Sequence, residues 1–184
     1  IADMRTSLVM SARTKVEKEP NYSFVTARIL MDQLRSEALG FLDVAEDSTY
    51  QEMEINYPKA FKAYIDKGIE LDILNPELKN YDLDKLGKAI DYTRDNQFTY
   101  LGLQTLYDRY FIHCDDVRYE LPQVFFMRVS MGLALEEDNR EERAIEFYKL
   151  LSSFDYMSST PTLFNSGTKR PQLSSCYLTT IPDD

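Results

Sequence analysis

Tryptophan is absent from this 184-residue sequence, and histidine and cysteine are nearly so, with one and two copies. Two cysteines cannot build the disulfide framework of a small secreted domain, so we expect a reducing, cytoplasmic location. A single histidine, His113, excludes a metal site built from two histidines of this chain. Six glycines and seven prolines are too few for a collagenous or low-complexity protein.

Long apolar runs and an excess of positive charge are lacking as well. No run reaches the ~18 apolar residues that cross a bilayer, and the first residues carry no apolar signal region. Acidic residues outnumber basic ones by 31 to 21, which gives a formal net charge of −10. Nonspecific affinity for nucleic acids comes from lysine and arginine. We therefore expect neither a nucleic acid polymer nor a membrane as a partner.

What the sequence does contain is the pattern of a helical protein with a core. Hydrophobic residues make up 43% of it and aromatic residues 12%, too much for a disordered chain. Apolar positions recur every three or four residues through most of the first 152 residues, as on the buried face of a helix. The predicted helices cover residues 1–18, 22–39, 58–68, 83–90, 98–107, 122–135 and 139–151.

Several local signals refine this prediction. Gly40 and Gly68 are expected to end their helices, Pro58 to lie in a first turn, and Asp82 to cap the helix that follows it. Residues 41–56 are irregular and acidic, which predicts an exposed connection. The helix at 122–135 is apolar on nearly all sides and should be central and buried.

Two features interrupt the helical pattern. The β-prone runs Arg109–Ile112 and Val117–Glu120 flank a four-residue polar segment, which predicts a small hairpin with its turn at residues 113–116. From Ser158 onward the sequence is typical of a loop, and residues 172–181 then have the composition of one strand. We expect a helical domain that leads into a different, strand-containing domain.

Few residues could carry chemistry. His113 and Cys114 could form a nucleophile and its base, but sequence neighbours in a turn seldom face each other, so a surface turn is favoured. The region from Thr160 to Cys176 gathers hydroxyls, a glycine and a thiol. Hydroxyls and backbone N–H groups can bind a phosphate, and the thiol could be a nucleophile or a redox group. Residue types alone favour a buried cysteine that acts as a small hydrophobe.

A resemblance changes that balance. The segment TPTLFNSGTKRPQLSSCYL, at residues 160–178, closely resembles the start of the catalytic barrel in the large subunit of class I ribonucleoside-diphosphate reductase. Upstream, LYDRYFI and RYELPQVFFMRVSMGLA resemble the same family's helical domain, in the same order. NYSFVTARILMDQLR, at residues 21–35, resembles the segment that follows its N-terminal ATP-cone.

The resemblance implies a mainly α fold: the helical N-terminal domain of that subunit with a small β-hairpin, ending in the first strand of a truncated α/β ten-stranded barrel. Residues 1–20 would be the last helix of an ATP-cone-like domain, residues 21–157 the all-α domain, and residues 158–184 the start of the barrel. Since the sequence starts without methionine and stops soon after this strand, we expect a piece of a longer protein.

The resemblance also implies roles for single residues. Cys176 matches the redox-active thiol on the first barrel strand, and its disulfide partner would lie outside this chain. Thr160 matches a contact to the substrate diphosphate, and Ser175 matches a substrate contact beside the cysteine. Strict alternation along a strand would place Ser175 and Cys176 on opposite faces, so Ser175 would act through its backbone or the strand would be irregular. Asp183 and Asp184 fall where the specificity-effector site begins.

The function implied by the resemblance is the reduction of ribonucleoside diphosphates to 2′-deoxyribonucleoside diphosphates by radical chemistry, for DNA precursor synthesis. The family's radical-bearing cysteine, second redox cysteine and catalytic carboxylate match no residue here. The 184 residues alone should therefore be inactive and bind no cofactor. The whole enzyme would respond to ATP, dATP and deoxynucleoside triphosphate effectors, receive its radical from a metal-containing small subunit, be reduced by thioredoxin or glutaredoxin, and form a homodimer of large subunits.

Two alternatives remain open. The chain could be a helical regulatory or protein-interaction module without chemistry, in which Cys176 is a passive core residue. It could also come from an adenosylcobalamin-dependent ribonucleotide reductase, because that class shares much of the barrel-entry pattern.

Overall fold

The computed structural model describes residues 2–180, and their fold is mainly helical. Its helices are α1 (Ala2–Arg13), α2 (Tyr22–Phe41), α3 (Met53–Glu70), α4 (Leu83–Ala89), α5 (Tyr100–Arg109), α6 (Pro122–Leu133), α7 (Arg140–Ser152) and α8 (Thr160–Asn165). Two 3₁₀ helices, η1 (Pro76–Asn80) and η2 (Tyr92–Gln97), and the short strands β1 (His113–Cys114) and β2 (Val117–Arg118) complete it. A mainly helical fold with one small antiparallel sheet is what the sequence predicts.

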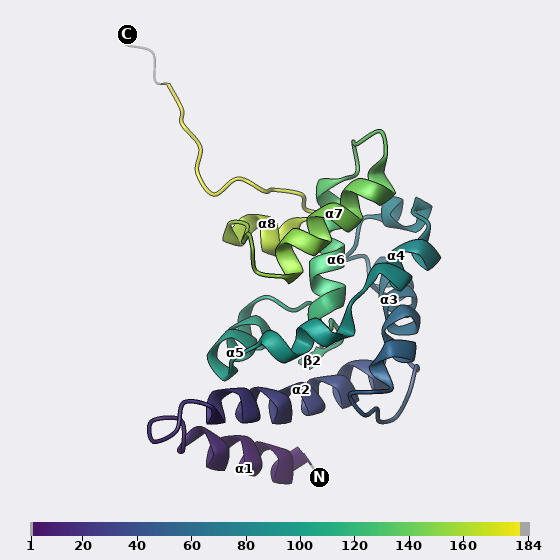
Figure 1. Ribbon diagram of the computed structural model, residues 1–184. Coiled ribbons are helices and arrows are strands. Elements are labelled where there is room, and N and C mark those ends of the chain that lie inside the picture. The colour runs from purple at the N-terminus through teal and green to yellow at the C-terminus, as the bar shows by residue number, and fades with distance from the viewer. Residues whose placement is uncertain (1, 181–184) are drawn as a thin grey trace.

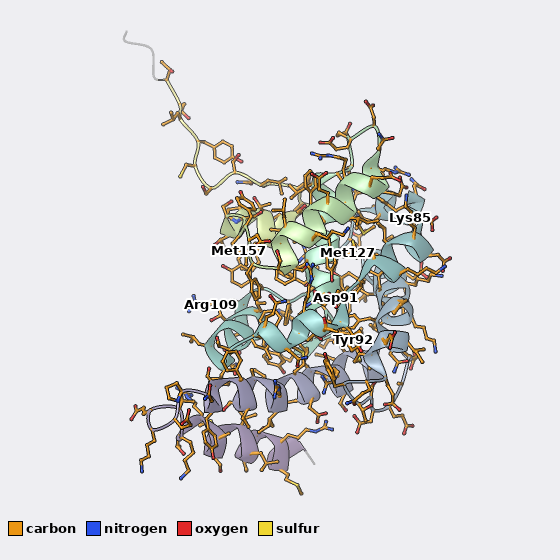
Figure 2. All side chains as sticks on the ribbon, in the orientation of Figure 1. Lys85, Asp91, Tyr92, Arg109, Met127 and Met157 are labelled. Carbon is orange, nitrogen blue, oxygen red and sulfur yellow. The ribbon has the colours of Figure 1, made fainter. Side chains whose placement is uncertain are left out.

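The helices pack around α6. Figure 1 shows α6 in the middle of the molecule, with α7 against it and α1 and α2 side by side at one end. Every residue from Pro122 to Met131 is buried, so the prediction of a central helix is confirmed. Met127, labelled in Figure 2, lies in this interior with no exposed surface. Pro122 stands in the first turn, where its missing N–H costs no helical hydrogen bond.

The hairpin forms as predicted, but its turn is shorter. His113 pairs with Arg118 and Cys114 with Val117, so only Asp115 and Asp116 are left in the turn. Both have positive φ, at 46° and 67°. Two successive residues in the left-handed region make the turn type whose twist matches a two-residue hairpin. His113 and Cys114 are therefore strand residues, which corrects the four-residue turn expected from the sequence.

Several helix ends also differ from the prediction. α1 ends at Arg13, and residues 14–18 form turns. Gly40 lies inside α2, whose C-cap is Leu42. α3 begins at Met53 and continues to Glu70, so Pro58 and Gly68 are interior residues. Gly68 is needed for packing instead, because a Cβ there would lie 2.4 Å from the Leu74 side chain. The predicted cap at Asp82 is confirmed: its carboxylate accepts a hydrogen bond from Lys85 N at 2.9 Å.

The C-terminal segment departs most from its prediction. Residues 160–165, expected as a loop, form α8. Residues 172–180, expected as a strand, pair with no strand among the described residues, and Figure 1 shows this run leading away from the body. A strand is defined by a hydrogen-bonded neighbour, which this segment does not have here. The barrel strand, and the division of the chain at residues 20 and 157, stay predictions.

Candidate functional site

The predicted substrate-binding segment is a short helix followed by a tight turn. Pro161 lies in the first turn of α8, and the helix stops where Ser166 adopts an extended conformation. Gly167 follows with φ of 76°, in the left-handed region that favours glycine. A Cβ at Gly167 would also lie 2.8 Å from the backbone oxygen of Arg128. The glycine is required because the chain turns in direct contact with α6.

Arg128, on α6, holds the end of α8. Its Nη1 donates hydrogen bonds to the Ser166 carbonyl at 2.7 Å and the Phe164 carbonyl at 3.3 Å, and its Nη2 donates to the Leu163 carbonyl at 3.2 Å. The last carbonyls of a helix have no partner within the helix. One guanidinium thus satisfies the end of α8 and ties it to the core.

Glu120 balances the charge of Arg128. The Nε of Arg128 donates to Oε1 of Glu120 at 2.7 Å, and neither side chain has exposed surface. The Tyr64 hydroxyl donates to the same carboxylate at 2.5 Å, and the Ile112 N–H donates to its other oxygen at 2.9 Å. Burial would lower the pKa of Arg128, but the negative charge of Glu120 and its hydrogen bonds raise it overall. Arg128 is therefore a buried, permanent cation.

Thr160, the predicted diphosphate contact, lies exposed at the start of α8. Its Oγ1 is 3.1 Å from the Tyr110 hydroxyl, at the end of α5. The Tyr110 ring stacks on Phe164, with ring centroids 4.6 Å apart and planes 7° apart. Arg109 and Met157, labelled in Figure 2, mark the same side of the molecule, where the end of α5 approaches the segment before α8. The structure therefore places Tyr110, whose ring is stacked on Phe164, beside Thr160, a contact that sequence analysis did not single out.

Ser175 and Cys176 lie in the extended run after α8. The run is held at its start, where Thr162 Oγ1 donates to the Leu173 carbonyl at 3.1 Å and Asn165 Nδ2 donates to the Gln172 carbonyl at 2.8 Å. In the described chain, neither Ser175 nor Cys176 makes a hydrogen bond. Cys176 is a free, exposed cysteine, so it is not a residue of this domain's core. Asp183 and Asp184 lie outside the described residues.

A cavity of about 400 Å³ opens beside α8. It is lined by Leu133, Phe147, Leu150, Leu151, Tyr156, Ser158, Ser159 and Thr162. The wall formed by α7 is mostly apolar, whereas the wall formed by α8 and the segment before it carries four hydroxyls, those of Tyr156, Ser158, Ser159 and Thr162. Two of these, on Ser159 and Thr162, lie 3.2 Å apart. Such a combination can take a ligand with one apolar and one polar side.

A second buried polar cluster connects α3, η2, α6 and α7. Asp95 accepts hydrogen bonds from the Tyr57 hydroxyl at 2.7 Å and from Gln123 Nε2 at 2.8 Å. The Tyr148 hydroxyl donates to the Gln123 amide oxygen at 3.0 Å. Burial raises the pKa of Asp95 to about 6, although the bonds from Gln123 and Tyr57 oppose this rise. Asp95 also lines a separate cavity of about 350 Å³ together with Arg28, Arg35, Tyr50 and Asn96.

His113 and Cys114 form no catalytic arrangement in the described structure. His113 is exposed and Cys114 half-buried on consecutive positions of β1, so their side chains point to opposite faces. The Sγ of Cys114 lies 3.9 Å from a carboxylate oxygen of Asp115. Among residues 2–180, no three histidine, cysteine or acidic side chains gather as metal ligands would. No helix in this range has the length and apolar character that a membrane span requires.

Three site residues were missed by sequence reasoning: Arg128, Glu120 and Tyr110. One signal for the first two was available, because Arg128 is a charged residue in an otherwise apolar helix and Glu120 precedes that helix. Because a buried charge requires a partner of opposite charge, the sequence could have suggested that Arg128 pairs with Glu120. Tyr110 gave no such signal, because its contact with Thr160 depends on tertiary packing.

Comparison with known proteins gives one consistent result. Residues 96–171 match the family model described as ribonucleotide reductase, all-alpha domain. A ribonucleoside-diphosphate reductase subunit alpha from Chlamydia muridarum is 53% identical over 177 residues, covering 96% of this chain and 16% of that protein. The protein of the same name from Helicobacter pylori is 35% identical over 184 residues, covering 99% of this chain and 22% of that one. The ribonucleoside-diphosphate reductase large subunit from Danio rerio is 36% identical over 183 residues, with the same two coverages of 99% and 22%. The chain spans about a sixth to a fifth of the length of these curated relatives.

Proposed function

We propose that this chain, which belongs to the family of ribonucleotide reductase large subunits, is the N-terminal helical part of a ribonucleoside-diphosphate reductase. The observation that carries the proposal is the α8 segment. Its helix is fixed to a buried cation, its hydroxyls face a cavity, and an exposed free thiol, Cys176, follows it. A helical interaction module would require neither an exposed thiol nor a segment of this sequence.

The proposed reaction removes the 2′-hydroxyl of a ribonucleoside diphosphate. The C2′–O bond breaks, a C2′–H bond forms, and the oxygen leaves as water. The two electrons come from the Cys176 thiol and a second cysteine outside this chain, and the two thiols become a disulfide. An external dithiol protein, thioredoxin or glutaredoxin, then reduces that disulfide by exchange. The radical that this chemistry needs would be supplied by a metal-containing small subunit, and we assign no described residue to hold it.

Substrate binding is proposed for the residues around α8. The hydroxyl of Thr160 would donate to the diphosphate, and Ser175 would contact the substrate next to Cys176. In the complete protein we expect residues 172–181 to pair as the first barrel strand, which would bring Ser175 and Cys176 to Thr160. Regulation by nucleotide effectors, a homodimer of large subunits and a cytoplasmic location belong to the same proposal. Two free cysteines among the described residues support a reducing location.

The test is a pair of cysteine variants in the full-length protein. Cys176→Ser keeps the approximate size of the side chain but cannot form a disulfide. We expect this variant to fold and to bind nucleoside diphosphate, but to lose multiple-turnover reduction with a dithiol reductant. The matched control is Cys114→Ser, which should leave turnover nearly intact because Cys114 lies on β1 beside a surface turn. Normal steady-state turnover by Cys176→Ser would reject the assignment.

A further inference from the structure

Tyr110 is held between two elements that meet at the proposed substrate site. It follows the last residue of α5, where its N–H donates to the Leu106 carbonyl at 2.9 Å. Its ring stacks on Phe164 of α8 and meets the edge of Phe125 of α6, with centroids 4.6 Å and 6.5 Å away. Aromatic contacts on two sides restrict where its hydroxyl can lie.

The restricted hydroxyl lies at the proposed diphosphate contact. The Tyr110 oxygen is 3.1 Å from Oγ1 of Thr160, and either atom can be the donor. Phe164 and Thr160 are four residues apart on α8, so they lie on the same face of that helix. Tyr110 therefore contacts one face of α8 at two positions, Thr160 and Phe164. Phe164 is itself fixed, since Arg128 donates a hydrogen bond to its carbonyl.

Hydrogen-bond chemistry gives the contact a direction when an anion is present. The ionised oxygens of a diphosphate only accept hydrogen bonds, so Thr160 must donate its single proton to them. The Thr160 oxygen can then accept from Tyr110, whose hydroxyl has a proton to give. A donor on the threonine oxygen also polarises its O–H bond and strengthens the bond to the anion.

We propose that Tyr110 is a positioning residue for the substrate diphosphate: it donates to Thr160 and aims the threonine proton at a phosphate oxygen. This inference rests on the proposed function, specifically on the diphosphate contact of Thr160. Tyr110 itself does not touch the substrate.

The test compares tyrosine-to-phenylalanine variants of the full-length enzyme. Tyr110→Phe removes the hydroxyl but keeps the ring on Phe164, so the thermal midpoint should stay unchanged. We expect KM for the nucleoside diphosphate to rise about fivefold, as for the loss of one hydrogen bond, while kcat changes less than about twofold. Tyr22→Phe is the matched control, because Tyr22 begins α2, is 39% exposed and belongs to none of the elements that form the proposed substrate site. It should leave both constants unchanged.

A double-variant cycle separates positioning from packing. In a Thr160→Val background, where no hydroxyl remains to be aimed, Tyr110→Phe should have no further effect on KM. In a Thr160→Ser background, which keeps the hydroxyl, the fivefold effect should return. Equal effects of Tyr110→Phe in the valine and wild-type backgrounds would overturn the proposal, as would an unchanged KM in Tyr110→Phe itself. If the wild-type enzyme reduces nucleotides and Thr160→Val weakens substrate binding, either of these two results would overturn the role of Tyr110 and leave the proposed function standing. An inactive wild type that binds no nucleoside diphosphate would overturn the proposed function together with this inference.

Discussion

Single buried polar residues determine how this domain is held together. Removing Arg128 and Glu120 from water is costly, and such pairs are often no more stable than apolar residues of the same volume. Their geometry is specific, however, because the guanidinium binds three carbonyls of one segment and the carboxylate binds two other elements. An apolar replacement would leave those carbonyls without donors. We interpret the pair as the residues that fix where α8 lies relative to α6.

Asp95 should make stability depend on pH in the opposite sense to an ordinary carboxylate. Its folded-state pKa of about 6 lies above the ~3.9 of an unfolded aspartate, because burial penalises the charge. The folded state therefore binds the proton more tightly. The resulting stabilisation is fully present below about pH 4 and is lost as the pH rises through about 6.

The prediction is tested with Asp95→Asn, which removes the titration. Between pH 4 and pH 7 the wild type should lose about 2 kcal/mol of unfolding free energy relative to Asp95→Asn. Urea unfolding at several pH values measures this difference. Asp66→Asn is the control for loss of a surface carboxylate, because the ion pair of Asp66 with Lys79 is mostly exposed and such a pair contributes at most about 1 kcal/mol. A constant gap between wild type and Asp95→Asn would show that Asp95 titrates normally.

At the scale of elements, α6 is the one on which the others depend. Phe126 has no exposed surface and contacts the rings of Phe125, Phe98 and Phe154. Phe126→Ala removes these contacts and leaves a cavity, so we expect a loss of roughly 3–5 kcal/mol in denaturant unfolding. The control is Leu101→Ala on α5, where the side chain is 74% exposed and the cost should stay below about 0.5 kcal/mol. A loss under about 1 kcal/mol for Phe126→Ala would mean that α6 is not the core.

The sequence predicted those elements whose signal is local. The burial of α6 followed from apolar residues on all its sides, and the cap at Asp82 from a side chain that bonds its own helix. The hairpin turn at residues 115–116 was predicted two residues too long, because aspartate adopts positive φ less often than glycine and so did not mark a two-residue turn. The helix ends predicted at Gly40 and Gly68 were wrong: α2 continues to Phe41 and α3 to Glu70, and Gly68 instead allows close contact with Leu74.

The candidate site was predictable only in part. Thr160, Ser175 and Cys176 came from resemblance to a family, whereas residue types alone favoured a buried cysteine. α8 was missed because proline and hydroxyl residues are typical of loops, and its last carbonyls depend on Arg128, 35 or more residues earlier in the chain. Tertiary contacts of this kind leave no periodic pattern in a sequence.

At the scale of the whole molecule, the attachment of the C-terminal segment ends abruptly. Asn75 N donates to the Gly167 carbonyl and Lys169 N to the Ile73 carbonyl, each at 3.0 Å, and Thr168 bridges to Leu74. The last bond to the body is the one at the Leu173 carbonyl. Tyr177 is then 67% exposed and Leu178 fully exposed. Apolar side chains without partners promote association with other molecules.

Two truncations of the 184-residue chain test where the folded body ends. Removing residues 174–184 deletes no described hydrogen bond, so the unfolding free energy should change by less than about 0.5 kcal/mol and self-association should fall. Removing residues 168–184 instead also deletes the bridge at Leu74 and the bond to Ile73, and it should cost roughly 1–3 kcal/mol, because buried backbone groups lose their partners. Urea unfolding measures the unfolding free energy, and light scattering at increasing concentration measures self-association. Equal stability of the two truncated chains would place the end of the folded body before Thr168. Unchanged self-association after loss of residues 174–184 would show that another surface, not this run, brings the molecules together.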